Sequence, residues 1–203
     1  MNDNDSNDTT LKSYEANVRK YVEGTPSDIS SDVKDWIDRA LSYAPQGSTV
    51  LELGSGFGRD ATYIENKGYK VVRTDAAKAF VKLMQSRGHQ ARVLNAITDD
   101  YSGLYTMVYA NAVLLHFKPA ETKQVLAKVY KSLEPNGIVA FTVKEGEGES
   151  WTEEKLNAPR YFCYWQENDL RQIVKEAGFT IIELTKGSTR NAQWLQVIAK
   201  KPA

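Results

Sequence analysis

The sequence predicts an α/β fold in which a doubly wound, seven-stranded and mostly parallel sheet ends in an antiparallel hairpin. Between residues 48 and 143, short apolar runs alternate with stretches of helical period, a pattern that implies right-handed βαβ units. The last two apolar runs are joined only by residues 185–191, too few for a crossover helix, so these strands should pair antiparallel. At 203 residues the chain suits one domain with a sizeable core.

The first 45 residues contain a polar tail and two expected helices. Residues 1–10 carry almost no apolar surface, so we expect a disordered tail there. An amphipathic stretch covers residues 11–22. A clearer helix covers residues 32–43, where Val33, Trp36 and Ile37 begin an i, i+3, i+4 pattern. We expect residues 11–45 to form a helical lid ahead of the first strand.

The remaining elements follow one another without a linker or an internal repeat. Strands are expected over residues 48–53, 69–74, 90–94, 104–110, 138–143, 179–184 and 194–200. Helices are expected over residues 59–66, 77–87, 120–133 and 167–177. Gly68, Gly88 and Gly178 follow three of these helices and stop them. Residues 11–203 should therefore form a single domain.

The amino-acid composition limits the kinds of molecule that the chain is expected to bind. Lys plus Arg equals Asp plus Glu at 26 each, which gives no general attraction to nucleic acid or to an anionic membrane. Cys163 is the sole cysteine, so neither an internal disulfide nor a cysteine-based zinc site is expected. No apolar run approaches the ~18 residues of a membrane span. We expect a soluble, cytoplasmic monomer or homodimer that carries no metal.

A glycine loop after the first strand is the most informative feature. Gly54, Gly56 and Gly58 alternate there, which lets the backbone turn sharply and a ligand approach closely. A dinucleotide fingerprint would need its third glycine at position 59, which is Arg59. Glu52 would repel a pyrophosphate but attract an ammonium group. The pattern favours a nucleoside that carries an amino acid; a tight turn without a ligand is the alternative.

The run from Glu52 to Gly58 resembles the first motif of class I S-adenosylmethionine-dependent methyltransferases, of the methyltransferase type 11 kind. The likeness extends over about residues 14–201 and implies a Rossmann-like fold, with S-adenosylmethionine as cofactor and S-adenosylhomocysteine as product. Asp75 ends the second strand where the family's carboxylate holds both ribose hydroxyls. It could instead cap the helix that begins near Ala77.

The resemblance implies a set of cofactor-binding residues. Some come from the segment Tyr14-x-x-Asn17-x-x-x-Tyr21, which resembles the family's entry segment that folds over the cofactor, and the others come from the glycine loop and the ends of four strands. Two positions depart from the family pattern, because Asn95 and Thr106 stand where an aspartate is usual. The set is Tyr14, Tyr21, Glu52, Gly54, Ser55, Gly56, Phe57, Gly58, Arg59, Asp75, Ala76, Asn95, Ala96, Ile97, Ala110 and Asn111.

Two further segments concern the methyl acceptor. His116 follows the fourth strand, where ligands bind in open α/β sheets, and is the candidate catalytic base; a packing role is the alternative. Residues 144–165 are long for a plain connection and should form a substrate-facing insertion. Within it, Arg160, Tyr161 and Tyr164 are the candidate substrate residues, although the aromatic rings could instead cover the sheet edge.

The function predicted is methyl transfer to an O, N or C atom of a small-molecule acceptor by in-line displacement. A cofactor-binding regulatory or scaffold module without catalysis is one alternative, and a tRNA or protein methyltransferase is another. A nucleotide-dependent oxidoreductase is disfavoured by Glu52 and Arg59.

Overall fold

A computed structural model describes residues 5–189 and 192–203. Its helices are α1 (Asp5–Ala16), α2 (Val18–Glu23), α3 (Ser31–Ser42), α4 (Arg59–Asn66), α5 (Lys78–Ser86), the 3₁₀ turn η1 (Leu114–His116), α6 (Pro119–Ser132) and α7 (Glu167–Glu176). Its strands are β1 (Thr49–Glu52), β2 (Lys70–Asp75), β3 (Ala91–Val93), β4 (Tyr105–Ala110), β5 (Leu133–Lys144), β6 (Glu149–Thr152), β7 (Arg160–Cys163), β8 (Thr180–Thr189) and β9 (Ala192–Lys200).

The main sheet has seven strands in the order β3-β2-β1-β4-β5-β9-β8. Strands β1 to β5 pair in parallel, whereas β9 runs antiparallel to both β5 and β8. The predicted fold class is therefore confirmed. The strand order reverses between β1 and β4, the place where open α/β sheets bind their ligands, beyond the carboxyl ends of the strands.

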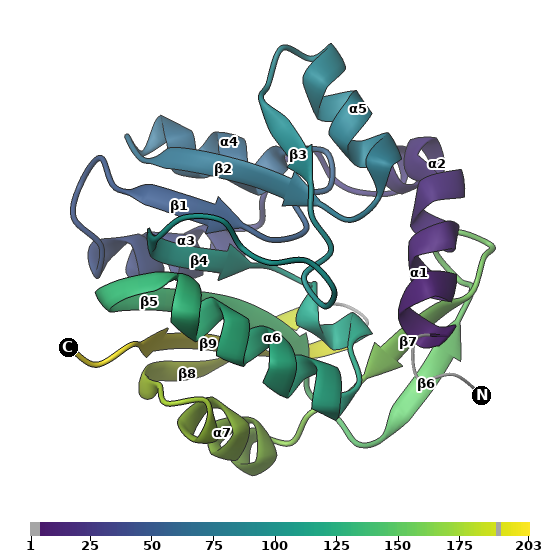
Figure 1. Cartoon of the computed structure of the whole chain (residues 1–203). Coiled ribbons are helices and arrows are strands. Elements are labelled where there is room, and N and C mark those ends of the chain that lie inside the picture. Colours follow the sequence, from purple (N-terminus) through teal and green to yellow (C-terminus); the bar gives the residue numbers. More distant parts are fainter. Residues whose placement is uncertain (1–4, 190–191) are drawn as a thin grey trace.

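Alternate side chains of the central strands pack on opposite faces of the sheet. Val50 joins a core with Trp36 of α3 and Ile64 of α4, while Leu51 joins the core on the other face, to which Leu126 of α6 also belongs. Helices α3 and α4 thus cover one face, and α6 and α7 cover the other (Figure 1). This packing leaves the carboxyl ends of the strands free of sheet-covering helices.

Helices α1 and α2 lie beside those carboxyl ends (Figure 1). The expectation of a disordered tail over residues 1–10 is wrong for residues 5–10, which form the first part of α1, and residues 1–4 lie outside the described part. Ser6, Asn7 and Thr10 are buried, and the Tyr161 amide donates to Thr10 Oγ1 at 3.0 Å. This hydrogen bond joins the polar first half of α1 to β7.

The single helical stretch expected over residues 11–22 is instead two helices, α1 and α2, that break at Asn17. Within the predicted insertion over residues 144–165, β6 and β7 pair as an antiparallel hairpin. Within residues 5–189 and 192–203, no helix is long and apolar enough to cross a membrane.

Candidate active site

The glycine loop joins β1 to α4 in left-handed backbone conformations. Gly54, Gly56 and Gly58 have φ values of 69°, 56° and 85°. A Cβ on Gly54 would lie 2.5 Å from Val113 Cγ2, so this position has no room for a side chain. A Cβ on Gly56 would meet only Tyr21 Cε1, at 3.9 Å. The backbone at Gly56 therefore borders open space, and this space is a cavity.

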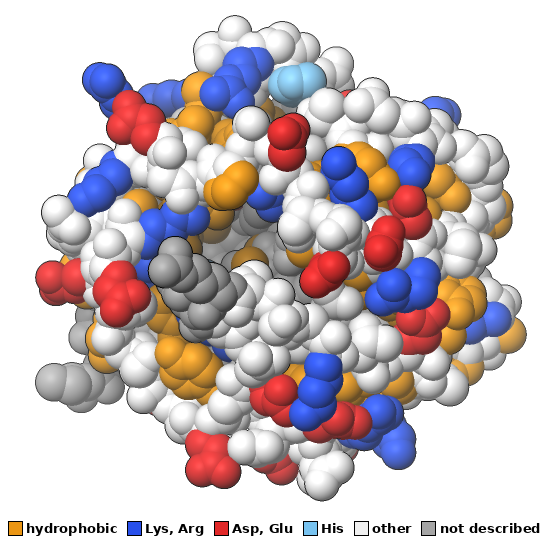
Figure 2. Space-filling model, turned by 180° about the vertical axis from the view of Figure 1, so that it is seen from behind, with side chains coloured by type: hydrophobic (Ala, Val, Ile, Leu, Met, Phe, Trp, Pro, Cys, Tyr) orange, Lys and Arg blue, Asp and Glu red, His pale blue; other side chains and the backbone are white. Residues whose placement is uncertain are grey.

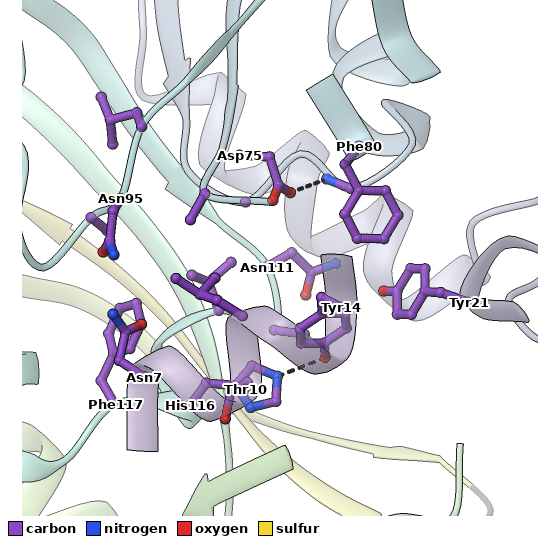
Figure 3. Close-up of a pocket in the computed structure, with 18 residues that line it drawn as sticks. Asn7, Thr10, Tyr14, Tyr21, Asp75, Phe80, Asn95, Asn111, His116 and Phe117 are labelled. Atoms are coloured by element: carbon purple, nitrogen blue, oxygen red, sulfur yellow. Dashed lines mark hydrogen bonds between the residues drawn. The ribbon is translucent and has the colours of Figure 1, made fainter. Parts of the chain in front are cut away.

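The cavity lies between the glycine loop, the ends of β2 and β4, and helix α1 (Figure 3), and its space of about 700 Å³ is partly open to solvent. The structure brings together many of the residues predicted from the sequence, although they come from six separate segments. Those that line this cavity are Tyr14, Tyr21, Gly54, Gly56, Asp75, Ala76, Asn95, Ala96, Asn111 and His116.

Asp75 contacts both the turn before α5 and the glycine loop. Its Oδ1 accepts the Ala77 amide at 2.8 Å, and its Oδ2 accepts the Gly56 amide at 2.8 Å. It is not the cap of α5, because Ala77 occupies the N-cap position and the helix has no side-chain cap. The carboxylate also lines the cavity (Figure 3). Burial raises the pKa of Asp75 to about 6, and the two backbone hydrogen bonds oppose that rise. An ordered carboxylate with spare lone pairs suits a vicinal diol.

A smaller pocket continues from the cavity past Gly56 and is lined by Glu52 and Asp60. Burial, and then the nearby Asp60 carboxylate, raises the pKa of Glu52 to about 8. Its Oε2 is buried without a hydrogen-bond partner. The Asp60 carboxylate does have hydrogen-bond partners, since it accepts hydrogen bonds from the Tyr109 hydroxyl at 2.9 Å and from Asn111 Nδ2 at 2.8 Å. An incoming cation with N–H donors would satisfy the Glu52 oxygen.

Three more predicted residues, Ser55, Phe57 and Arg59, line this smaller pocket. The Arg59 Nε donates to Asp60 Oδ1 at 2.9 Å, so the guanidinium already has a carboxylate partner.

His116 lies where this cavity meets a second, larger groove. Its Nδ1 is 2.6 Å from the carbonyl oxygen of Tyr161, which can only accept, so Nδ1 carries the proton. Nε2 is then an acceptor, and the Tyr14 hydroxyl donates to it at 2.9 Å (Figure 3). Burial, reinforced by Arg160 and Lys144, lowers the pKa of His116 to about 3.

This neutral histidine predicts a loss of stability in acid. Because the folded pKa of His116 is about 3, only the unfolded chain binds this proton at pH values between about 3 and 6.5. The contribution of His116 to the free energy of unfolding is fully present above about pH 6.5. It falls as the pH drops and is smaller by about 2 kcal/mol at pH ~5. Urea unfolding of wild type and His116→Gln at pH ~5 and ~7.5 measures it. The variant should lose less stability between the two pH values, whereas His89→Gln should behave as wild type; equal losses in all three proteins would contradict the assignment.

Several predicted residues lie away from the cavities. Gly58 starts α4, and Ile97 and Ala110 are buried in the core. Tyr161 points into the core on one side of β7 and Tyr164 lies beyond its end, so neither lines a cavity. Asn95, in contrast, does line the cavity, and its Oδ1 accepts the Ile97 amide at 2.9 Å.

The structure also adds lining residues that sequence reasoning missed. Alternation along β7 places Phe162 beside Arg160 in the larger groove, a period-2 signal that the sequence contains. Asn7 lies in the segment expected to be disordered, and its buried Nδ2 has no hydrogen-bond partner. The others are Thr10, Leu11, Phe80, Leu94, Ala112, Val113 and Phe117. In the described part of the chain, no group of His, Cys, Asp and Glu side chains is arranged to hold a metal ion.

Comparison with known proteins yields one family. The model of a family described as "methyltransferase domain" matches residues 26–184. The chain is 22% identical to an uncharacterized methyltransferase of Synechocystis, over 79% of this chain and 80% of that protein. It is 28% identical to methyltransferase AacuQ of Aspergillus aculeatus, over 67% of this chain but 45% of that protein.

Solved structures share the fold at low identity. The 1,6-didemethyltoxoflavin-N1-methyltransferase of Burkholderia thailandensis, with bound S-adenosylhomocysteine, aligns with a TM-score of 0.69 at 20% identity, covering 85% of this chain and 79% of that one. The magnesium protoporphyrin IX methyltransferase of Synechocystis, also with bound S-adenosylhomocysteine, aligns with a TM-score of 0.66 at 18% identity, covering 84% and 80%.

Proposed function

The chain belongs to the methyltransferase-domain family, and we propose that it transfers a methyl group from S-adenosylmethionine to a small-molecule acceptor. The observation that carries this proposal is the cavity over Gly56, which joins an acidic pocket on one side and the larger groove on the other. The methyltransferase class predicted from the sequence agrees with the family match.

The residues around the cavity fit S-adenosylmethionine by their own chemistry. The unpartnered Glu52 Oε2 suits the α-ammonium group, and the Asp75 carboxylate suits the ribose hydroxyls. Gly56 leaves room for close approach to the backbone. Asn95 and Ala96, at the other end of the cavity, would flank the adenine.

Bound S-adenosylmethionine supplies a methyl carbon attached to a sulfonium sulfur, which is a good leaving group. The chain therefore has to orient the acceptor and exclude water. Helix α1 contributes by placing Tyr14 over the cavity, where His116 accepts its hydroxyl hydrogen bond. A histidine whose pKa is about 3 is a weak base, so we assign His116 to hold Tyr14 rather than to deprotonate the acceptor.

Two observations support a small acceptor. The larger groove meets the cavity over Gly56 at His116, and α2, β7 and β9 all contribute to its walls. A small molecule held between these walls would therefore lie next to the cofactor. The two structural relatives named above act, by their names, on 1,6-didemethyltoxoflavin and on magnesium protoporphyrin IX, both small molecules.

Methyl transfer from radiolabelled S-adenosylmethionine tests this function. The purified protein is given three fractions of a cell extract: a small-molecule filtrate, tRNA and protein. We expect label and S-adenosylhomocysteine to appear with the filtrate alone. Label in tRNA or protein instead would reject the small-molecule acceptor, and no turnover with any fraction despite cofactor binding would favour a binding module.

Glu52 predicts how cofactor affinity depends on pH. The pKa of Glu52 is about 8 before binding, and an ammonium group would favour its charged form, so binding releases a proton. The affinity for S-adenosylhomocysteine should rise more than about tenfold between pH ~6 and ~8. Calorimetry in buffers of different ionisation enthalpy counts the released protons. Glu52→Gln should weaken binding and reduce proton release, while Glu153→Gln, an exposed control, should not; unchanged proton release in Glu52→Gln would refute the role of Glu52.

A further inference from the structure

The larger groove carries a set of basic side chains that the cofactor does not need. Lys144 at the end of β5, Lys155 and Arg160 of β7 all line it. The space is about 1780 Å³, part of it open to solvent. Figure 2 shows a hollow near the middle of the molecule's rear face, with hydrophobic side chains inside it and Lys or Arg side chains close to its edge.

None of these three cations forms an ion pair within the described residues. Arg160 is 7% exposed, its Nε has no hydrogen-bond partner, and its Nη1 donates to the Tyr14 hydroxyl at 3.4 Å. Lys144 Nζ lies 4.2 Å from the centre of the Phe162 ring. Lys155 Nζ donates to Thr25 Oγ1 at 2.7 Å. Rings and hydroxyls hold these side chains in place without neutralising them.

The carboxylates that line the same groove offset this charge only in part. Asp28, Asp32 and Glu154 are all exposed, so water screens them, whereas the three basic side chains are buried or half-buried. Burial and then Arg160 lower the pKa of Lys144, and Glu154 opposes that fall. Burial, then Arg160 and Arg59, lower the pKa of Lys155 to about 8. The fold thus holds like charges together at a cost that a bound anion would remove.

The walls around these cations are largely apolar. Phe162 lies under both Lys144 and Arg160, and Leu115 and Trp194 also line the groove. The Arg160 guanidinium presents a planar set of donors that matches a carboxylate. An occupant of this groove needs an anionic group for the cations and a flat apolar body for the rings.

We propose that the methyl acceptor is an aromatic carboxylate, with its carboxylate bound by Arg160 and Lys144, and Lys155 nearby, and its ring system against Phe162 and Trp194. This inference rests on the proposed methyltransferase function and names the substrate class for the same site. The carboxylate is the anchoring group, so the groove selects acceptors by charge before any chemistry occurs.

Calorimetric titration of the S-adenosylhomocysteine-loaded protein tests the proposal. The probes are benzoate, 2-naphthoate and indole-3-acetate, each paired with its neutral amide, together with 2-naphthyl phosphate. We expect at least one carboxylate to bind roughly tenfold or more tightly than its amide, since a hydrogen bond to a charged group contributes about 1.5–3 kcal/mol. Lys144→Gln and Arg160→Gln should each remove most of that preference, while Lys131→Gln, an exposed control on α6, should keep it.

The outcomes separate this proposal from the function on which it rests. If S-adenosylhomocysteine fails to bind the wild-type protein, the proposed function itself is rejected. If it binds but no carboxylate exceeds its amide, or if Lys144→Gln keeps the full preference with unchanged S-adenosylhomocysteine affinity, the anionic acceptor is rejected and the methyltransferase proposal stands. Tighter binding of 2-naphthyl phosphate than of 2-naphthoate would replace the carboxylate by a phosphate monoester.

Discussion

Replacing Gly56 with alanine is expected to weaken the binding of S-adenosylhomocysteine about ten- to hundredfold. The added Cβ would project into the cavity, where only Tyr21 Cε1 comes within 4 Å of it, at 3.9 Å. The methyl group would therefore occupy space that the cofactor needs, and overpacking of this kind costs about 1–3 kcal/mol.

Gly88 supplies the matched control for this prediction. It also has a positive φ, 85° against 56° for Gly56, and a Cβ there meets nothing within 4 Å. Both alanine variants should lose about 1–2 kcal/mol of stability through left-handed backbone strain. Thermal unfolding and calorimetry together separate the effects: similar unfolding temperatures with a binding loss only in Gly56→Ala support the site. Equal cofactor affinity in the two variants would remove Gly56 from it.

Asp75→Ala is expected to lower the affinity for S-adenosylhomocysteine by roughly a hundredfold or more. The carboxylate would accept hydrogen bonds from two ribose hydroxyls, and each such bond to a charged acceptor contributes about 1.5–3 kcal/mol. Asp75 also holds the Gly56 and Ala77 amides, so part of the loss comes from a less ordered loop.

Two companion variants distinguish these contributions. Asp75→Asn keeps one acceptor oxygen in place and should bind with intermediate affinity. Asp100→Ala removes an exposed aspartate outside the cavity and should bind as wild type does. Calorimetric titration at one pH and salt concentration measures all of them. An Asp75→Ala affinity within about threefold of wild type, less than 1 kcal/mol, would show that this carboxylate does not hold the ribose.

The sheet and the glycine loop were predictable because their signals are local. The apolar runs of β1, β2 and β4 are short and bounded, and the alternating glycines that follow β1 can adopt the positive φ values found there. The sheet and the loop depend on neighbours in the sequence, which is why residue patterns alone indicate them. Asp75 could be assigned because it ends the second predicted strand, at the position that the family resemblance implies.

The missed features depend on contacts between distant segments. The polar start of α1 has no apolar pattern, and its order comes from partners such as the Tyr161 amide, 151 residues away from Thr10. Asn7 could not be assigned to the cavity for the same reason. The face of β7 that meets the groove required its exact register, because a shift of one residue exchanges Arg160 and Phe162 for Tyr161.

The most direct test of the central claim is a calorimetric titration of the wild-type protein with S-adenosylmethionine and S-adenosylhomocysteine. The arrangement of Glu52, Gly56 and Asp75 around one cavity predicts saturable binding of both at a single site. Binding should release protons between pH ~6 and ~8, because Glu52 would become charged. If neither molecule binds at millimolar concentration, about −4 kcal/mol or weaker, the cavity is not a cofactor site and the proposed function is wrong.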